Sequence, residues 1–148
     1  ANQQGLSNVL LNEVDWREAV IPVAGQPNLD IMLAGPPSRR APDLVATGLT
    51  NFLEQATRDY ALVVLDSPPL MNFAEPLHMA TAVDGVILIT VAGETHRKAV
   101  QSALTTLRRV RANIVCIVLN KVTKELSSDY QSYGYYGKYY KRYYHANA

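Results

Sequence analysis

Three short runs of apolar residues limit the folds that this 148-residue chain can adopt. They cover residues 61–65, 85–91 and 114–119. None alternates apolar with polar side chains, and β-branched residues are common in all three. Runs of this kind are typical of strands that are buried on both faces of a parallel sheet.

The segments between and before these runs carry helical patterns. Residues 96–110 place apolar side chains every three or four positions, with Thr95 as the expected N-cap. Residues 76–82 predict a shorter helix, and a longer one upstream is expected to end near Asp59. The apolar face of that longer helix comprises Val45, Leu49, Phe52, Leu53 and Ala56. Residues 29–33 predict a further strand, and strand–helix–strand units in series predict a doubly wound, mostly parallel α/β sheet.

The bulk composition excludes several classes of protein. The net charge of +1 argues against a dedicated nucleic-acid binder, so no nucleic-acid partner is expected. The single cysteine, Cys116, lies inside the third apolar run and is expected to be buried and inert. The three histidines show no metal-ligand spacing with one another or with Cys116. The sequence shows no signal peptide and no long apolar span.

Trp16 is expected to anchor the core.

Polar residues follow all three apolar runs, at the strand ends beyond which ligands bind in open parallel sheets, and Glu94 and Thr95 follow the second. Asp66 directly follows the first run, which is the Walker B pattern of a Mg²⁺-binding aspartate, although aspartate also ends strands for reasons of turn geometry. Asn120 follows the third run, where its amide could bond an adenine edge or simply cap the strand. A Gly-x-x-x-x-Gly-Lys-[Ser/Thr] phosphate loop is absent from the 148 residues.

Eight of the nine tyrosines fall within residues 130–144. They are Tyr130, Tyr133, Tyr135, Tyr136, Tyr139, Tyr140, Tyr143 and Tyr144. They follow neither a strand nor a helix period, and Gly134 and Gly137 interrupt any regular element. Such a segment is expected to present its hydroxyls, and phosphorylation is the chemistry that uses many exposed phenols. We place the globular domain at residues 1–125 and a flexible tyrosine-rich tail at residues 126–148.

These features together resemble the bacterial tyrosine kinases (BY-kinases) of capsule and exopolysaccharide export. The resemblance lies in residues 60–70, 83–89 and 117–121, followed by the tyrosine-rich tail. Residues 28–37 and 5–10 resemble further segments of the same family. The resemblance implies a P-loop NTPase-like fold of the MinD/ParA type. It also implies ATP-dependent autophosphorylation of the tail of the same or a neighbouring subunit, which regulates polysaccharide synthesis and export.

The resemblance also implies roles for individual residues. Asp66 matches the aspartate that holds Mg²⁺ directly or through water and assists the attacking phenol. Ser67 stands where the family usually has threonine, and Asn120 matches a position near the adenine of ATP. The eight tail tyrosines match the autophosphorylated cluster. The implied cofactors are therefore ATP and Mg²⁺.

The family further implies partners and a place in the cell. The partners are neighbouring kinase subunits in a homo-oligomer, a membrane polysaccharide co-polymerase domain, fused or separate, and a phosphotyrosine phosphatase. The chain is accordingly expected in the cytoplasm, at the inner face of the cell membrane.

The main departure from the family is the absence of the Walker A and Walker A′ motifs. We therefore expect an N-terminally incomplete domain that corresponds to the C-terminal portion of a kinase. It is expected to be inactive alone, because the phosphate loop supplies most of the positioning and charge stabilisation of the transferred phosphoryl group. Two alternatives remain: a non-kinase ATPase fragment of the ParA/MinD type, and an interaction module with an aromatic tail.

Overall fold

The computed structural model describes residues 4–123. The expected domain boundary at residue 125 and the tyrosine-rich segment, residues 130–144, lie outside the described residues.

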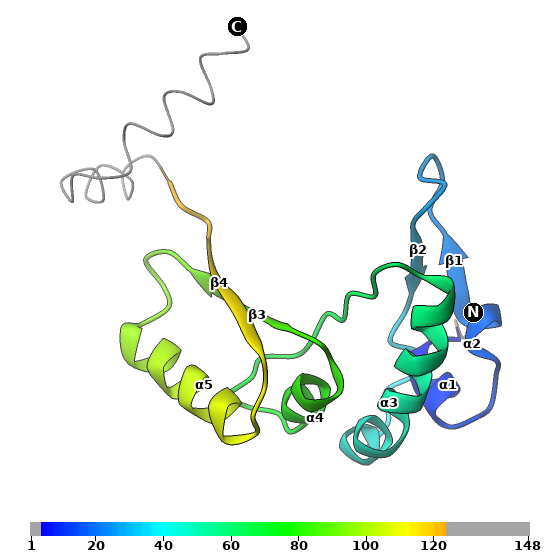
Figure 1. Ribbon diagram of the computed structural model, residues 1–148, viewed down its shortest axis with the longest axis horizontal. Coiled ribbons are helices and arrows are strands. Elements are labelled where there is room, and N and C mark those ends of the chain that lie inside the picture. Colours follow the sequence, from blue (N-terminus) through cyan, green and yellow to red (C-terminus); the bar gives the residue numbers. More distant parts are fainter. Residues whose placement is uncertain (1–3, 124–148) are drawn as a thin grey trace, which may run out of the picture.

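Helices and short strands alternate along the described part of the chain (Figure 1). In chain order, the elements are α1 (Leu6–Leu10), α2 (Trp16–Ala19), β1 (Val20–Pro22), β2 (Asp30–Met32), α3 (Ala41–Asp59), α4 (Glu75–Ala82), β3 (Val86–Val91), α5 (Arg97–Arg109) and β4 (Ile114–Asn120). The α/β class is therefore as predicted.

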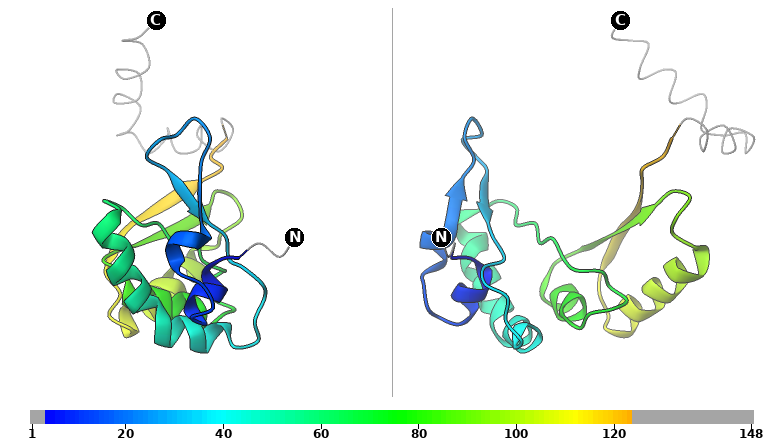
Figure 2. Two further views of the ribbon diagram at one scale, coloured as in Figure 1. Left: turned by 90° about the vertical axis from the view of Figure 1, so that its right-hand side faces the viewer. Right: turned by 180° about the vertical axis from the view of Figure 1, so that it is seen from behind.

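The described strands form two two-stranded sheets. Strands β1 and β2 pair antiparallel, whereas β3 and β4 pair parallel and are joined through α5. The second and third apolar runs thus form neighbouring parallel strands, as predicted. Figures 1 and 2 show α4 and α5 on the same side of the β3–β4 sheet.

The first apolar run, residues 61–65, does not form the predicted strand. It is irregular chain that crosses from α3 to the part of the molecule that holds the β3–β4 sheet (Figure 1). Leu62 and Val64 are 76% and 79% exposed, while Val63 and Leu65 pack against the core. The prediction was wrong because a strand needs a hydrogen-bonded neighbour, and the described part of the chain supplies none for this run.

The core of the N-terminal half forms between α3 and α2. Trp16, Leu49, Phe52, Leu53 and Ala56 make up its buried cluster. Trp16 meets Phe52 edge-on, with ring centroids 6.3 Å apart, so the prediction that Trp16 anchors the core is confirmed. On the opposite side of the cluster, α4 packs against α3 and adds Met79.

Two helix boundaries can be compared with the positions predicted from the sequence. Helix α3 ends at Asp59, as its apolar face predicted. Helix α5 begins at Arg97 with His96 as N-cap, so Thr95 is not the cap. The Thr95 hydroxyl instead accepts a hydrogen bond of 2.9 Å from the Val91 amide and closes the loop after β3.

Cys116 is exposed, contrary to the prediction of a buried thiol. It is paired across the sheet with Ile87, which is 56% exposed, so this face of the β3–β4 sheet is open in the described residues. The apolar run alone could not distinguish a strand covered on both faces from one covered on a single face. No helix among residues 4–123 is both long and apolar enough to cross a membrane.

Candidate functional site

The chain that leads to Asp66 is fixed where it leaves α3. Tyr60 follows the helix, and its hydroxyl donates a hydrogen bond of 2.5 Å to Oδ2 of Asp30 in β2. Its ring lies 6.0 Å from the Trp16 ring, centroid to centroid. Tyr60 therefore ties the beginning of the Asp66 segment to the β1–β2 hairpin and to the core.

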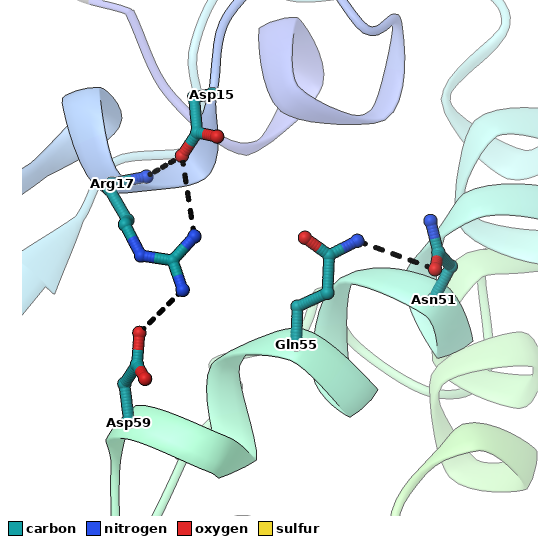
Figure 3. A network of polar contacts seen from close by, with 5 residues as sticks. All are labelled: Asp15, Arg17, Asn51, Gln55 and Asp59. Carbon is teal, nitrogen blue, oxygen red and sulfur yellow. Dashed lines mark hydrogen bonds and ion pairs between the residues drawn. The ribbon is translucent and has the colours of Figure 1, made fainter.

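An ion pair supports the same junction (Figure 3). Nη2 of Arg17 lies 2.7 Å from Oδ2 of Asp59, the last residue of α3. The guanidinium of Arg17 also lies 4.4 Å from the centre of the Trp16 ring. The Asp15 side chain accepts a hydrogen bond of 2.8 Å from the Arg17 amide and caps α2. Together these contacts fix the end of α3 against α2.

Sequence analysis missed this junction, because its partners lie up to 42 positions apart. The hydrogen bond from Tyr60 to Asp30 raises the pKa of the Tyr60 phenol. Desolvation and the negative charges of Asp30 and Asp59 raise that pKa further. The phenol therefore stays protonated, and remains a donor, over the neutral pH range.

Asp66 and Ser67 lie on the exposed chain beyond this junction. Neither hydrogen bonds nor ion pairs engage the Asp66 carboxylate within residues 4–123, which leaves both oxygens free to bind a ligand. The Ser67 hydroxyl donates to the carbonyl oxygen of Pro68 at 3.2 Å. A carboxylate and a hydroxyl thus occupy consecutive positions of the chain at the end of the first apolar run.

A Mg²⁺ ion would find a single protein carboxylate here. No group of three or more His, Cys, Asp or Glu side chains gathers into a metal site within the described residues. Magnesium keeps several waters and is commonly bound by one or two carboxylates together with substrate phosphates. A lone, unpaired Asp66 therefore fits a nucleotide-bound Mg²⁺ and does not fit an all-protein metal cage.

Asn120 ends β4, opposite Val91 in the register of the sheet. Its Oδ1 accepts a hydrogen bond of 2.8 Å from the amide of Lys121, which has a positive φ of 54°. The side chain therefore caps the strand through its oxygen, while its exposed amide NH₂ remains available to a ligand. Both interpretations made from the sequence are compatible with this geometry.

The structure does not bring all the candidate residues together. Asp66 lies outside both sheets, whereas Asn120 belongs to the β3–β4 sheet, and no hydrogen bond within the described residues joins them. The candidate phosphoacceptors lie outside the described residues. They are Tyr130, Tyr133, Tyr135, Tyr136, Tyr139, Tyr140, Tyr143 and Tyr144.

No protein-family model matches the chain. Tyrosine-protein kinase YwqD of Bacillus subtilis (strain 168) is 28% identical over 137 residues, which cover 92% of this chain and 56% of that protein. Tyrosine-protein kinase CpsD of Streptococcus agalactiae is 29% identical over 138 residues, which cover 91% of this chain and 58% of that protein. The chain thus spans rather more than half the length of these curated relatives.

The fold leads to the same group of proteins. The crystal structure of the VpsO kinase domain matches with a TM-score of 0.75 and 25% sequence identity. The match covers 82% of this chain and 60% of that one. The resemblance predicted from the sequence motifs is therefore confirmed: over most of its length, this chain is similar to bacterial tyrosine kinases.

Proposed function

We propose that this chain is part of a bacterial tyrosine autokinase. The complete enzyme transfers a phosphoryl group from ATP to tyrosines in its own or a neighbouring subunit's C-terminal cluster, and so regulates polysaccharide synthesis and export. The observation that carries this proposal is the similarity to tyrosine-protein kinases over about nine-tenths of the chain, combined with the eight clustered tyrosines.

The proposal includes a doubly wound sheet of the P-loop type in the complete domain. Leu62 and Val64 are exposed apolar side chains on the first run, and Ile87 and Ile89 are exposed on β3. Side chains of this kind are expected to be covered when further strands and their crossover helices complete the domain, because helices cover both faces of a parallel sheet. Residues 61–65 would then pair as a strand, and Asp66 would lie at the carboxyl edge of the sheet, beyond which ligands bind.

Asp66 then has a defined task. Its negative charge would hold a Mg²⁺ ion, which would neutralise the phosphates of ATP during transfer. The Ser67 hydroxyl supplies a neighbouring oxygen, and the free NH₂ of Asn120 contributes a donor to the adenine edge. The attacking group is the phenol of a tail tyrosine, which would pass its proton to the Asp66 carboxylate as the new oxygen–phosphorus bond forms and the bond between the transferred phosphorus and the ADP oxygen breaks.

The sequence contains no phosphate loop, so ATP binding needs one from another polypeptide segment. The family resemblance predicts such a segment in the part of YwqD that the similarity leaves uncovered, and we propose to supply it by fusing this chain behind that part. We refer to this fusion below as the completed kinase.

The partners and the location follow from the family resemblance. We propose neighbouring kinase subunits that exchange tails, a membrane polysaccharide co-polymerase domain, and a phosphatase that removes the phosphates. Their site of action would be the cytoplasmic face of the cell membrane.

Incubation of the completed kinase with MgATP tests the function, with phosphotyrosine mapped by mass spectrometry and released phosphate measured in parallel. Autokinase activity predicts phosphate on residues 130–144. Release of phosphate without phosphotyrosine would identify an ATPase of the ParA/MinD type instead. Failure to bind ATP at all would favour an interaction module with an aromatic tail.

A further inference from the structure

The C-terminal end of α5 carries an arginine cluster that the proposed phosphoryl transfer does not use. The cluster comprises Arg108, Arg109 and Arg111, all of which are exposed. None of the three forms an ion pair or a side-chain hydrogen bond within residues 4–123. The sequence has no acidic residue between Glu94 and Glu125, so no neighbour in the sequence neutralises these charges. Asp84 comes to this end of α5, where its carbonyl oxygen accepts a hydrogen bond of 2.6 Å from the Asn113 side chain, but it forms no ion pair with the cluster within residues 4–123.

The backbone holds the cluster in a defined arrangement. The Ala112 amide donates to the carbonyl oxygen of Leu107, and the Arg111 amide donates to that of Arg108, both at 3.0 Å. This is the Schellman pattern of helix ends. Leu107 is 1% exposed and anchors the last turn, so the arginines stand on a fixed part of the structure.

Arg111 occupies an unfavourable backbone conformation. Its φ is +58°, in the left-handed region where glycine is the usual residue at this position of the motif. Attraction to the helix dipole accounts for Arg108 and Arg109 at the end of α5, but it does not require a strained arginine at position 111. Strained residues of this kind cluster at functional sites, which makes Arg111 a candidate for a role beyond helix stability.

The chemistry of the cluster suits phosphate groups. Guanidinium groups bind phosphate oxygens in pairs of parallel hydrogen bonds, which lysine cannot do. Three neighbouring arginines that form no ion pair within residues 4–123 can therefore bind closely spaced phosphates.

We propose that the arginine cluster binds the tyrosine-rich segment, residues 130–144, once that segment is phosphorylated. Beyond Lys121 the unmodified chain carries four basic and two acidic side chains, a net charge of +2, and is repelled by the cluster. Each phosphate adds about −1.5 to −2 charges, so two or more reverse the sign. The inference rests on the proposed function in one respect: the tail must become phosphorylated.

The chain is long enough to reach the cluster. The arginine cluster lies near the start of β4, and the tail continues from the other end of this strand. These two ends are about 23 Å apart, because β4 has seven residues. The 16 residues from Lys124 to Tyr139 can span up to about 50 Å. Figures 1 and 2 place α5 at the opposite end of the molecule from α1 and α2, so the phosphorylated tail would bind far from them.

Binding of the tethered segment does not need high affinity. A segment joined by a short linker has an effective concentration on the order of millimolar. If the free peptide binds with a Kd of about 100 μM, the same segment would therefore be mostly bound when it is part of the chain. The phosphorylated tail would then be withdrawn from the sites of neighbouring subunits, and unmodified tails would take its place there.

The test uses the full 148-residue chain and a fluorescent synthetic peptide of residues 130–144. The peptide carries phosphotyrosine at Tyr135, Tyr136, Tyr139 and Tyr140, and its binding is measured by anisotropy at low salt. Replacing all three arginines of the cluster by glutamine is expected to weaken binding at least about tenfold, because each charge-assisted contact is lost. The control variant replaces Arg97 and Lys98, at the other end of α5, by glutamine. Its Kd for the peptide is expected to change by no more than about threefold, because only the overall positive charge of the protein is reduced.

A second variant separates binding from folding. Arg111→Gly relieves the left-handed strain, so it is expected to raise the melting temperature while it weakens peptide binding. A gain in stability together with a loss of affinity cannot be ascribed to damaged structure. The unphosphorylated peptide is expected not to bind.

Three results would overturn the proposal: equal affinity in the triple variant, an equal loss in the Arg97 and Lys98 control, or binding of the unphosphorylated peptide. Phosphatidylserine vesicles that displace the peptide and bind the cluster more tightly would assign the surface to a membrane. Because the peptide is phosphorylated by synthesis, this test is independent of kinase activity. A completed kinase that leaves its tail unmodified would refute the proposed function while the peptide result stood.

Discussion

The hydroxyl of Tyr60 donates a hydrogen bond of 2.5 Å to the Asp30 carboxylate, and this contact joins the end of α3 to strand β2. Tyr60 begins the chain that leads to Asp66. The position of the candidate catalytic carboxylate therefore depends on a contact across 30 positions of sequence.

Replacing Tyr60 by phenylalanine tests this contact. The ring remains against Trp16, so only the hydrogen bond is lost, and we expect destabilisation of about 0.5–1.5 kcal/mol at pH 7. Urea unfolding of the two proteins measures the difference. An unchanged free energy of unfolding would show that water replaces the Tyr60 hydroxyl as the donor to the Asp30 carboxylate at no cost.

The same pair predicts a pH dependence. Because the folded-state pKa of Tyr60 is raised above its unfolded value, its stabilisation is fully present below about pH 10 and is lost as the pH rises through the raised folded-state pKa. The gap in stability between wild type and Tyr60→Phe should therefore be constant from pH 6 to 9 and shrink above pH 10. The other eight tyrosines occur in both proteins and cancel, so a gap that widens above pH 10 would contradict the assigned sign.

The ion pair between Arg17 and Asp59 should contribute little by itself. Its side chains are 56% and 45% exposed, so a double-mutant cycle with alanine at both positions should give a coupling of about 0.2–1 kcal/mol. Arg17→Ala should nevertheless cost more than Asp59→Ala, because it also uncovers the face of Trp16. Equal losses would show that the contact with the ring contributes nothing.

The exposure of the Leu62 side chain is expected to differ between this chain and the complete domain. Because Leu62 is 76% exposed, Leu62→Ala should change the free energy of unfolding of the 148-residue chain by less than about 0.5 kcal/mol. In the completed kinase, where we propose that further strands and helices bury residue 62, the same change should cost about 2–5 kcal/mol.

Thermal or urea unfolding of the four proteins provides the comparison. Leu49→Ala is the control: Leu49 is fully buried in the described structure, so its replacement should cost about 2–5 kcal/mol in both backgrounds. A small effect of Leu62→Ala in both backgrounds would contradict the proposed sheet.

Local patterns predicted the local elements well. The apolar spacing along α3 placed its end at Asp59, and the runs at β3 and β4 predicted parallel strands joined through a helix. The same reasoning was wrong for residues 61–65 and for Cys116. An apolar run records which side chains need cover, but whether it pairs as a strand depends on a neighbour from elsewhere in the chain.

The candidate site was predicted only in part. Asp66 and Asn120 could be selected because each follows an apolar run, and the structure leaves ligand-binding atoms free on both. The link between Tyr60 and Asp30 could not be predicted, because a contact across 30 positions leaves no periodic signal in a single sequence. The roles of the eight tail tyrosines stay predictions.

The most direct measurement is the phosphotyrosine content of residues 130–144 in the completed kinase carrying Asp66→Asn. The amide is nearly isosteric with the carboxylate but lacks the charge that holds Mg²⁺. We predict a loss of at least about 100-fold in tail phosphorylation relative to wild type. The control is Asp84→Asn, which alters an exposed carboxylate that precedes β3, and it should leave the rate unchanged. Tail phosphorylation at the wild-type rate in Asp66→Asn would contradict the account.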